Sequence, residues 1–116
     1  ECLMLGSAHL ASDGKRKLKN FDPQEIAILE GEIDRMTSEM PPQKAFVLPA
    51  APRSASVCHI ARTVCRRAER SSIGIEEKSD EILLTIKYLN RLSDYLFTLG
   101  RYECYKNNIS EDFWLV

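Results

Sequence analysis

The sequence is poor in helix-breaking residues and in long apolar runs. Its 116 residues include five glycines and five prolines, while 44% of the residues are hydrophobic. A chain with this apolar content can bury a core, which excludes a disordered chain. No run of about 18 apolar residues occurs, so we expect no membrane-spanning helix and no membrane partner. The length fits one domain, which we expect to cover residues 1–116.

An excess of charge of either sign is also missing. The sequence has 16 basic and 17 acidic residues, which gives a formal net charge of -1. A general electrostatic attraction to nucleic acid therefore does not exist, and we expect no nucleic-acid partner. Any basic chemistry must be local.

The four cysteines contain no CxxC pair of the kind that binds zinc or forms a redox centre. They are Cys2, Cys58, Cys65 and Cys104. Cys58 and Cys65 lie seven residues apart and can share one helix face, where packing is favoured over metal binding. Reduced thiols without a disulfide framework indicate a protein of the cytosol or of an organelle matrix, and we expect a cytoplasmic one.

Several motifs that bind phosphate or perform nucleophilic catalysis are absent from the sequence. It contains no Walker loop, no glycine-rich phosphate cradle and no GxSxG element. Strand-like alternation and internal repeats are missing too. Helical periodicity is what remains, and it predicts an all-α, up-and-down helical bundle.

Four segments show the spacing of amphipathic helices. Residues 1–11 read as the end of one helix. The second begins with Asp22 as its N-cap and ends at Pro41 and Pro42. The third runs from about residue 54 to 72, and the fourth from a capping Ser79 to about residue 105.

Each of the last three expected helices has an apolar face. In the second helix it consists of Ile26, Leu29, Ile33 and Met36. The third helix has a narrow face of small side chains, which would let another helix approach closely: Ala55, Cys58, Ala61, Cys65 and Ala68. The core face of the fourth helix is Ile82, Ile86, Leu89, Leu96 and Leu99.

The proline-rich segment between the second and third helices is too apolar for an ordinary exposed loop. Phe46, Val47 and Leu48 either plug the end of the bundle or line a pocket. The chain ends in another apolar cluster, residues 113–116, which we expect to fold back onto the bundle or onto another subunit.

A polar stripe runs along the third helix at spacings of three and four residues. Its members are His59, Arg62, Arg66, Glu69 and Arg70. One interpretation is an ion-pair network with Glu69 and Asp94. The other is an anion site, because a row of guanidinium groups one turn apart suits a polyphosphate. His59 has no obvious partner and is interpreted as a packing residue rather than a base.

Three sequence blocks resemble the PduO-type ATP:cob(I)alamin adenosyltransferases. They are "FVLP" at 46–49, "HIARTVCRRAER" at 59–70 and "YLNRLSDYLFTLGRY" at 88–102. The resemblance implies a five-helix bundle, with the first helix absent from this sequence, that forms a homotrimer with active sites between subunits. It also implies transfer of the 5′-deoxyadenosyl group of ATP to cob(I)alamin with release of triphosphate.

The resemblance further implies roles for individual residues. Arg66, Glu69 and Asn90 would contact ATP, with Glu69 near its Mg²⁺. Arg62 would join Arg66 in catalysis and reach an acidic residue of the neighbouring subunit. Phe46 would lie beneath the corrin ring of cobalamin. A flavoprotein that reduces cob(II)alamin would be the partner protein.

The sequence departs from the family pattern in two places. The family's N-terminal ATP loop and the helix after it have no counterpart, which fits either a piece of a longer chain or a truncated relative. A bundle without that helix would expose Leu3, Leu5 and Leu10, which favours the former. In addition, "LPAAP" at 48–52 replaces a glycine-bearing loop. The alternative function is a catalytically inactive, trimeric corrinoid-binding or interaction bundle.

Overall fold

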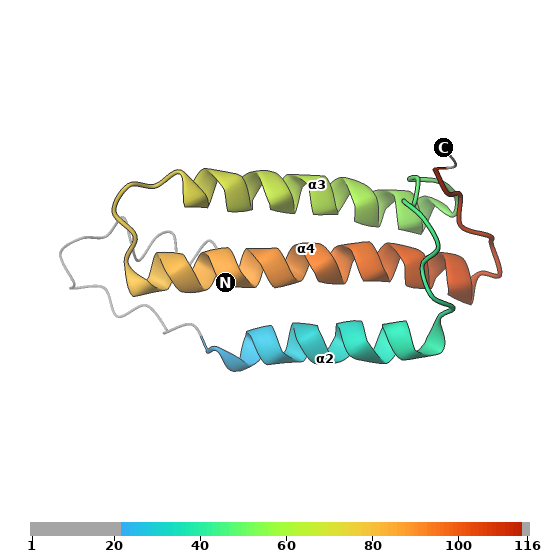
Figure 1. The fold of residues 1–116 in the computed structure, drawn as a ribbon, viewed down its shortest axis with the longest axis horizontal. Helices are drawn as coiled ribbons and strands as arrows, with labels where there is room; N and C mark the ends of the chain where they lie inside the picture. Colours follow the sequence, from blue (N-terminus) through green and yellow to red (C-terminus); the bar gives the residue numbers. More distant parts are fainter. Residues whose placement is uncertain (1–21, 115–116) are drawn as a thin grey trace.

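The computed structural model describes residues 22–114, which form three α-helices (Figure 1). They are α2 (Gln24–Glu39), α3 (Arg53–Ile73) and α4 (Asp80–Lys106). The expected all-α fold is confirmed, whereas the helix expected at residues 1–11 lies outside the described residues. Within residues 22–114, every helix is too short or too polar to cross a membrane.

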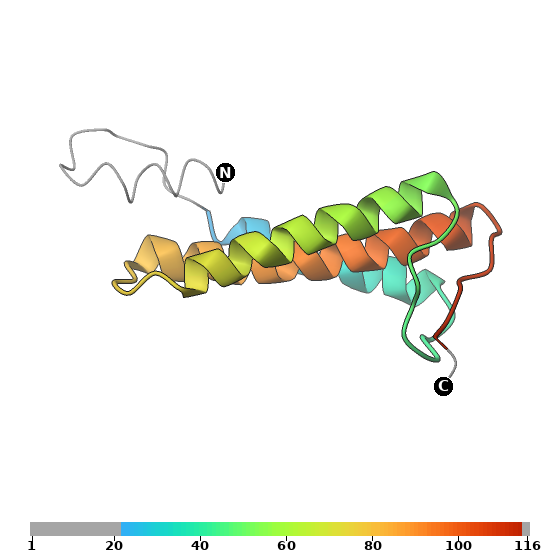
Figure 2. The same ribbon diagram turned by 90° about the horizontal axis from the view of Figure 1, so that it is seen from above.

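The central helix is α4, which packs against both of the others (Figure 1). Following the chain from blue to red, α2 and α4 run in one direction and α3 runs in the opposite one. The backbones of α2 and α3 do not come into contact. The described helices therefore form a row with α4 in the middle, and Figure 2 shows the row turned by 90°.

Local capping explains where the helices begin and end. The Ser79 hydroxyl accepts a hydrogen bond from the backbone N–H of Ile82 at 3.3 Å, so the predicted cap of α4 is confirmed. At α2 the cap is Pro23 rather than Asp22. The Asp22 carboxylate still accepts from the backbone N–H of Gln24 at 2.9 Å. Helix α2 ends where Met40 turns extended before two prolines.

Small side chains bring α3 and α4 close together. Ala55 on α3 and Ser93 on α4 are almost completely buried. The thiol of buried Cys65 donates to the backbone carbonyl of Leu89 at 3.2 Å. The predicted small-residue face is confirmed over most of its length, although Ala68 at its far end is exposed.

Helix α2 is held on α4 by a few apolar contacts and a surface network of charges. Its buried residues are Ile26 and Met36, followed by Met40 just after the helix. The stripe predicted for this helix is therefore confirmed at its two ends, and its middle residues, Leu29 and Ile33, are half-buried.

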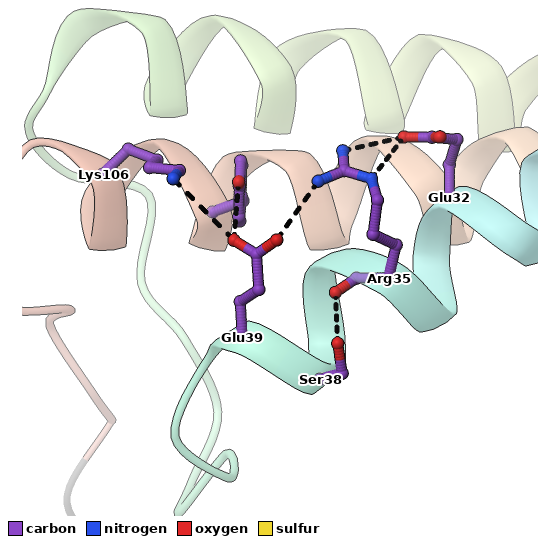
Figure 3. Close-up of polar contacts among 6 residues, drawn as sticks. Glu32, Arg35, Ser38, Glu39 and Lys106 are labelled. Carbon is purple, nitrogen blue, oxygen red and sulfur yellow. Dashed lines mark hydrogen bonds and ion pairs between the residues drawn. The ribbon is translucent and has the colours of Figure 1, made fainter.

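The charged network lies at the C-terminal end of α2 (Figure 3). Arg35 bonds to Glu32 at 2.8 Å and to Glu39 at 3.4 Å, while the Tyr102 hydroxyl of α4 donates to Glu39 at 2.8 Å. The hydrogen bond from Tyr102 lowers the pKa of the Glu39 carboxyl, and the charges of Lys106 and Arg35 lower it further. Because these groups are exposed, we expect the network to set the register of α2 more than its stability.

The segments that precede α3 and follow α4 meet at one end of the bundle. Val47 forms an isolated antiparallel bridge with Phe113, and the backbone N–H of Trp114 donates to the carbonyl of Phe46 at 2.8 Å. The chain after α4 therefore folds back onto the bundle, as expected from its apolar end, and it contacts both the proline-rich segment and Arg101 of α4. Residues 115 and 116 lie outside the described part.

Candidate functional site

The arginines of the polar stripe on α3 do not form the ion-pair network that the sequence allowed. Among residues 22–114, none of Arg62, Arg66 and Arg70 makes a salt bridge. Asp94, the acid proposed as their partner, instead pairs with Arg91 of its own helix at 2.6 Å. The ion-pair interpretation is therefore wrong for this part of the chain.

A hydrogen-bonded pair joins α3 to α4 where two of the predicted ATP-binding residues meet. The Nδ2 of Asn90 donates to Oε2 of Glu69 at 3.0 Å. The Oδ1 of Asn90 in turn accepts from Arg91 at 2.7 Å. Asn90 therefore has its amide orientation fixed from both sides, and the Glu69 carboxylate is held at the surface between the helices.

Arg66 lies one turn before Glu69 on the same face of α3. Its side chain is exposed, and its guanidinium carries five N–H donors. Since no carboxylate of the described residues neutralises it, this arginine is available to bind an anion in bidentate geometry. Three of the predicted site residues, Arg66, Glu69 and Asn90, are thus brought together.

Arg62 lies one turn further toward the start of α3, over an aromatic ring of α4. Its guanidinium carbon is 5.0 Å from the centre of the Phe97 ring, within cation–π range. The ring of His59 packs on the same phenylalanine, with 6.0 Å between ring centres. Phe97 therefore fixes the position of Arg62 without neutralising its charge.

His59 is a packing residue, as the sequence indicated, although it does not share the exposed face of the arginines. Only 7% of the residue is exposed, because its ring sits against Gly100 of α4. Burial lowers the pKa of the imidazole, and the charge of Arg62 lowers it further, while Glu111 opposes the shift. These surroundings favour the neutral form of the imidazole between the two helices.

Phe46 does not plug the end of the bundle. The residue is 79% exposed, and Trp114, whose backbone is bonded to it, is 57% exposed. The two aromatics border a shallow surface depression together with Gln43 and Lys44. Of the two roles open for Phe46, lining a binding surface agrees with the structure and plugging does not.

Phe46 and the Glu69–Asn90 pair lie at different levels of α3. The proline-rich segment leads into the first turn of the helix, and Glu69 lies 16 residues further, about 24 Å along the axis. Arg62 and Phe97 lie between these two levels. The exposed aromatics therefore lie beside the end of the bundle where α3 begins, and the arginines of the polar stripe, unpaired within residues 22–114, lie further along α3.

Glu69 has the free ligand capacity that a magnesium ion would need. One carboxylate oxygen accepts from Asn90, and the other accepts no hydrogen bond within residues 22–114. The same residues contain no group of three or more histidine, cysteine or acidic side chains that could hold a metal. Mg²⁺ keeps several waters and binds readily to phosphates with one carboxylate, so Glu69 fits that role and no dedicated cage is needed.

Three residues of this region received no role from the sequence. Phe97 and Arg101 fall on one face of α4 with Asn90 and Asp94, and that spacing was the available signal. Glu111 follows α4 with no periodic relation to it. Its contact with Arg101 arises from the tertiary fold, which a spacing argument does not reach.

These features define the class of protein: an all-α bundle with a face of arginines on one helix, unpaired within the described residues, and exposed aromatics at its end. A family model described as cobalamin adenosyltransferase matches residues 1–103. The chain belongs to the cobalamin adenosyltransferase family.

Similar curated proteins are corrinoid adenosyltransferases. The chain is 45% identical over 96 residues to the MMAB protein of Mus musculus, which covers 81% of this chain and 40% of the relative. Identity to MMAB of Homo sapiens is 40% over 114 residues, covering 98% of this chain and 43% of the relative. Identity to the corrinoid adenosyltransferase of Bacillus subtilis (strain 168) is 45% over 93 residues, covering 79% of this chain and 48% of the relative. The chain thus spans less than half the length of these relatives.

Similar solved structures come from the PduO-type ATP:corrinoid adenosyltransferase of Lactobacillus reuteri. A phenylalanine-to-alanine variant complexed with cobalamin and ATP superposes with a TM-score of 0.86 at 31% identity. The match covers 98% of this chain and 64% of that variant. An arginine-to-lysine variant complexed with ATP has a TM-score of 0.83 at 32% identity, with 98% of this chain and 65% of that chain covered.

Proposed function

We propose that the full-length protein transfers the 5′-deoxyadenosyl group of ATP to cob(I)alamin, forming adenosylcobalamin and releasing triphosphate. The observation that carries this proposal is the exposed guanidinium of Arg66, without a carboxylate partner in residues 22–114, one turn from the Glu69–Asn90 pair. The family and the cobalamin and ATP complexes of its structural neighbours support the same reaction. The chain spans less than half the length of the relatives that it matches, so the activity is proposed for the whole protein.

The α3 stripe would bind the triphosphate of ATP. Cobalt of cob(I)alamin attacks C5′ of the ribose, the C5′–O bond breaks, and the electron pair leaves with the triphosphate. The negative charge that develops on this leaving group needs fixed donors, which Arg66 supplies without a competing carboxylate. Asn90 and Glu69 would contact ATP and its Mg²⁺. The ion would supply further neutralisation of the phosphates.

The position of Arg62 suggests how ATP lies on the helix. Arg62 is one turn from Arg66 toward the start of α3, and Phe97 supports it. A nucleotide whose phosphates lie at Arg66 and Glu69 would direct its ribose toward the corrin end. Arg62 has no acidic partner in residues 22–114, which supports the expectation that it pairs with an acid of a neighbouring subunit in a homotrimer.

Phe46 would provide the corrin contact. Cob(II)alamin is hard to reduce while a lower axial ligand stays on cobalt, and an apolar ring pressed under the corrin excludes that ligand. The exposed ring of Phe46 is free to do so, and Trp114 extends the aromatic surface. A flavoprotein that reduces cob(II)alamin would deliver the electron. The reduced thiols fit a cytoplasmic setting for this chemistry.

The test is an anaerobic reaction of the full-length protein with MgATP and chemically prepared cob(I)alamin, followed by chromatography of the corrinoids. We expect adenosylcobalamin in repeated turnovers. A protein that binds cobalamin but yields none would be the inactive corrinoid-binding bundle instead.

A further inference from the structure

A buried arginine of α4 holds the two segments that carry the exposed aromatics. Arg101 is 7% exposed, although arginine is almost never buried unless it is paired. Its Nε donates to Oε1 of Glu111 at 2.7 Å, and its Nη2 donates to Oε2 of the same carboxylate at 3.4 Å. The Nη2 also donates to the backbone carbonyl of Pro41 at 3.1 Å. One side chain thus binds the chain both before Phe46 and after α4.

The two segments held by Arg101 are also bonded to each other. The backbone N–H of Leu48 donates to the carbonyl of Asp112 at 2.7 Å, and that of Trp114 donates to the carbonyl of Phe46 at 2.8 Å. Arg101, the proline-rich segment and the segment after α4 therefore form a closed ring of contacts. The backbone of Phe46 is part of this set of contacts, because its carbonyl accepts the hydrogen bond from Trp114. Its backbone position is therefore fixed.

Side-chain packing alone would not fix this end of the bundle. A cavity of about 260 Å³ lies between α4 and the two segments, with Arg101 in its wall. Met40, Tyr105 and Phe113 line it as well. The ring of Phe46 is itself mostly exposed and gains little from packing. Because this pocket leaves the two segments incompletely packed on α4, the contacts of Arg101 with Glu111 and Pro41 contribute to holding them, together with the backbone hydrogen bonds between the segments.

We propose that Arg101 is a positioning residue that holds the backbone of Phe46 so that its ring can press under the corrin and exclude the lower ligand of cobalt. This assignment rests on the proposed function. It extends that function to a residue that contacts neither ATP nor the corrin. A displacement of about 1 Å at the aromatic ring is enough to lower a rate markedly, because the ligand-excluding contact depends on its geometry.

The test removes the Arg101–Glu111 ion pair without leaving a buried charge. Arg101→Met alone would strand the Glu111 carboxylate, so the variant combines Arg101→Met with Glu111→Met, since a buried pair is often replaceable by apolar residues. Met36→Ala is the matched control, because it opens a cavity in the α2–α4 core and lowers stability away from Arg101. Arg101→Lys retains the charge and loses the forked geometry.

Two readouts distinguish positioning from mere stability. The first is the ratio of adenosylation rates from cob(II)alamin with reductant and from prepared cob(I)alamin. The second is the fluorescence anisotropy of Trp114, the one tryptophan in these 116 residues, which reports the segment bonded to Phe46 whether or not the enzyme is active.

We expect the double variant to lose about tenfold more rate from cob(II)alamin than from cob(I)alamin and to show lower Trp114 anisotropy. Met36→Ala should lower the melting temperature and leave both readouts as in wild type. A double variant with the wild-type rate ratio and anisotropy would overturn the assignment while the proposed function stands. A wild-type protein that makes no adenosylcobalamin from either form would refute the proposed function, and the role of Arg101 with it.

Discussion

Arg66 and Arg91 show how differently two arginines on facing helices are used. Arg91 is bonded to Asn90 and paired with Asp94, so its charge is neutralised within the protein. Arg66 is exposed and has no such partner among the described residues. A cation that the fold leaves unneutralised beside an ordered carboxylate and amide is suited to a ligand that brings its own negative charge.

Replacing Arg66 should therefore impair turnover far more than stability. Loss of one charge-assisted donor to the developing triphosphate is expected to cost about 3 kcal/mol in the transition state, which is roughly a hundredfold in kcat. Because the side chain is exposed, the free energy of unfolding should change by about 0.5 kcal/mol or less. Steady-state kinetics and urea unfolding of Arg66→Ala measure the two quantities.

The neighbouring Arg67 supplies the control for this prediction. It is also exposed on α3, but it lies off the polar stripe, so Arg67→Ala should keep nearly normal kinetics. Equal losses in the two variants would mean that general positive charge on α3 matters rather than the position of Arg66.

Phe46→Ala should separate reduction from transfer. Removing the ring opens space for water or the displaced base beneath cobalt, so cob(II)alamin would keep its fifth ligand and resist reduction. Adenosylation that starts from cob(II)alamin and a reductant should fall strongly. Adenosylation of prepared cob(I)alamin should persist, because that form has already lost its lower ligand.

Spectra of bound cob(II)alamin provide the direct measurement for Phe46. Wild type should contain a four-coordinate population that Phe46→Ala lacks. Ile28→Ala is a suitable control, since Ile28 is another exposed apolar residue but lies on α2. The same four-coordinate fraction in wild type and Phe46→Ala would exclude a corrin contact for this ring.

The sequence predicted the members of the polar stripe but not all of their contacts. Helical spacing is local, so it placed Arg62, Arg66 and Glu69 on one face. It also placed His59 on that face. In the structure the His59 ring instead packs against Gly100, in the interface between α3 and α4. Contacts across long separations, such as Arg101 with Pro41, depend on how segments close at the end of the bundle.

At the scale of the helices, the contact between α3 and α4 is set by residues with little or no side chain. The third helix was expected at residues 54–72 and is found at Arg53–Ile73. Such agreement follows because capping residues, prolines and periodicity act locally. The small-residue face of α3 also predicted that another helix packs closely against it, and α4 does so. The position of Gly100 opposite His59 could not be predicted, since it depends on the register of two helices.

Glycine-to-alanine changes test this packing directly. A Cβ at Gly100 would lie 3.0 Å from Nε2 of His59 and 3.4 Å from the carbonyl oxygen of Ala55. Gly100→Ala should therefore push the helices apart and lower the free energy of unfolding by about 1–3 kcal/mol. A Cβ at Gly31 on α2 would meet nothing within 4 Å. Gly31→Ala should therefore raise the free energy of unfolding by about 0.5–1 kcal/mol. Chemical denaturation that shows Gly100→Ala to be stabilising would contradict the observed register.

At the scale of the whole molecule, the described helices form a row with open faces. Because the backbones of α2 and α3 do not contact each other, each of them packs against α4 and, among the described helices, against no other. One open face of α3 carries Val57, Ile60 and Val64, which are about half exposed or more and spaced by three and four residues. Contiguous apolar surface of this kind is uncommon on monomers.

We therefore expect the full-length protein to assemble as a trimer. An intersubunit site would also give Arg62 an acidic partner, which residues 22–114 do not provide. Light scattering coupled to size-exclusion chromatography should report three subunits. Arg62→Ala should weaken this assembly, whereas Arg67→Ala should not. A monomer that turns over ATP and cob(I)alamin would show that the site is complete within one chain.

The products of ATP cleavage test the proposed reaction most directly. In a single-turnover reaction of the full-length protein with MgATP and cob(I)alamin, ³¹P NMR identifies the phosphate product, and chromatography quantifies adenosylcobalamin. Attack at C5′ predicts one intact triphosphate for each adenosylcobalamin formed, and almost none of either with Arg66→Ala. Release of ADP and phosphate, or of AMP and diphosphate, without a new cobalt–carbon bond would show that the α3 stripe serves ATP hydrolysis instead, and it would contradict the proposal.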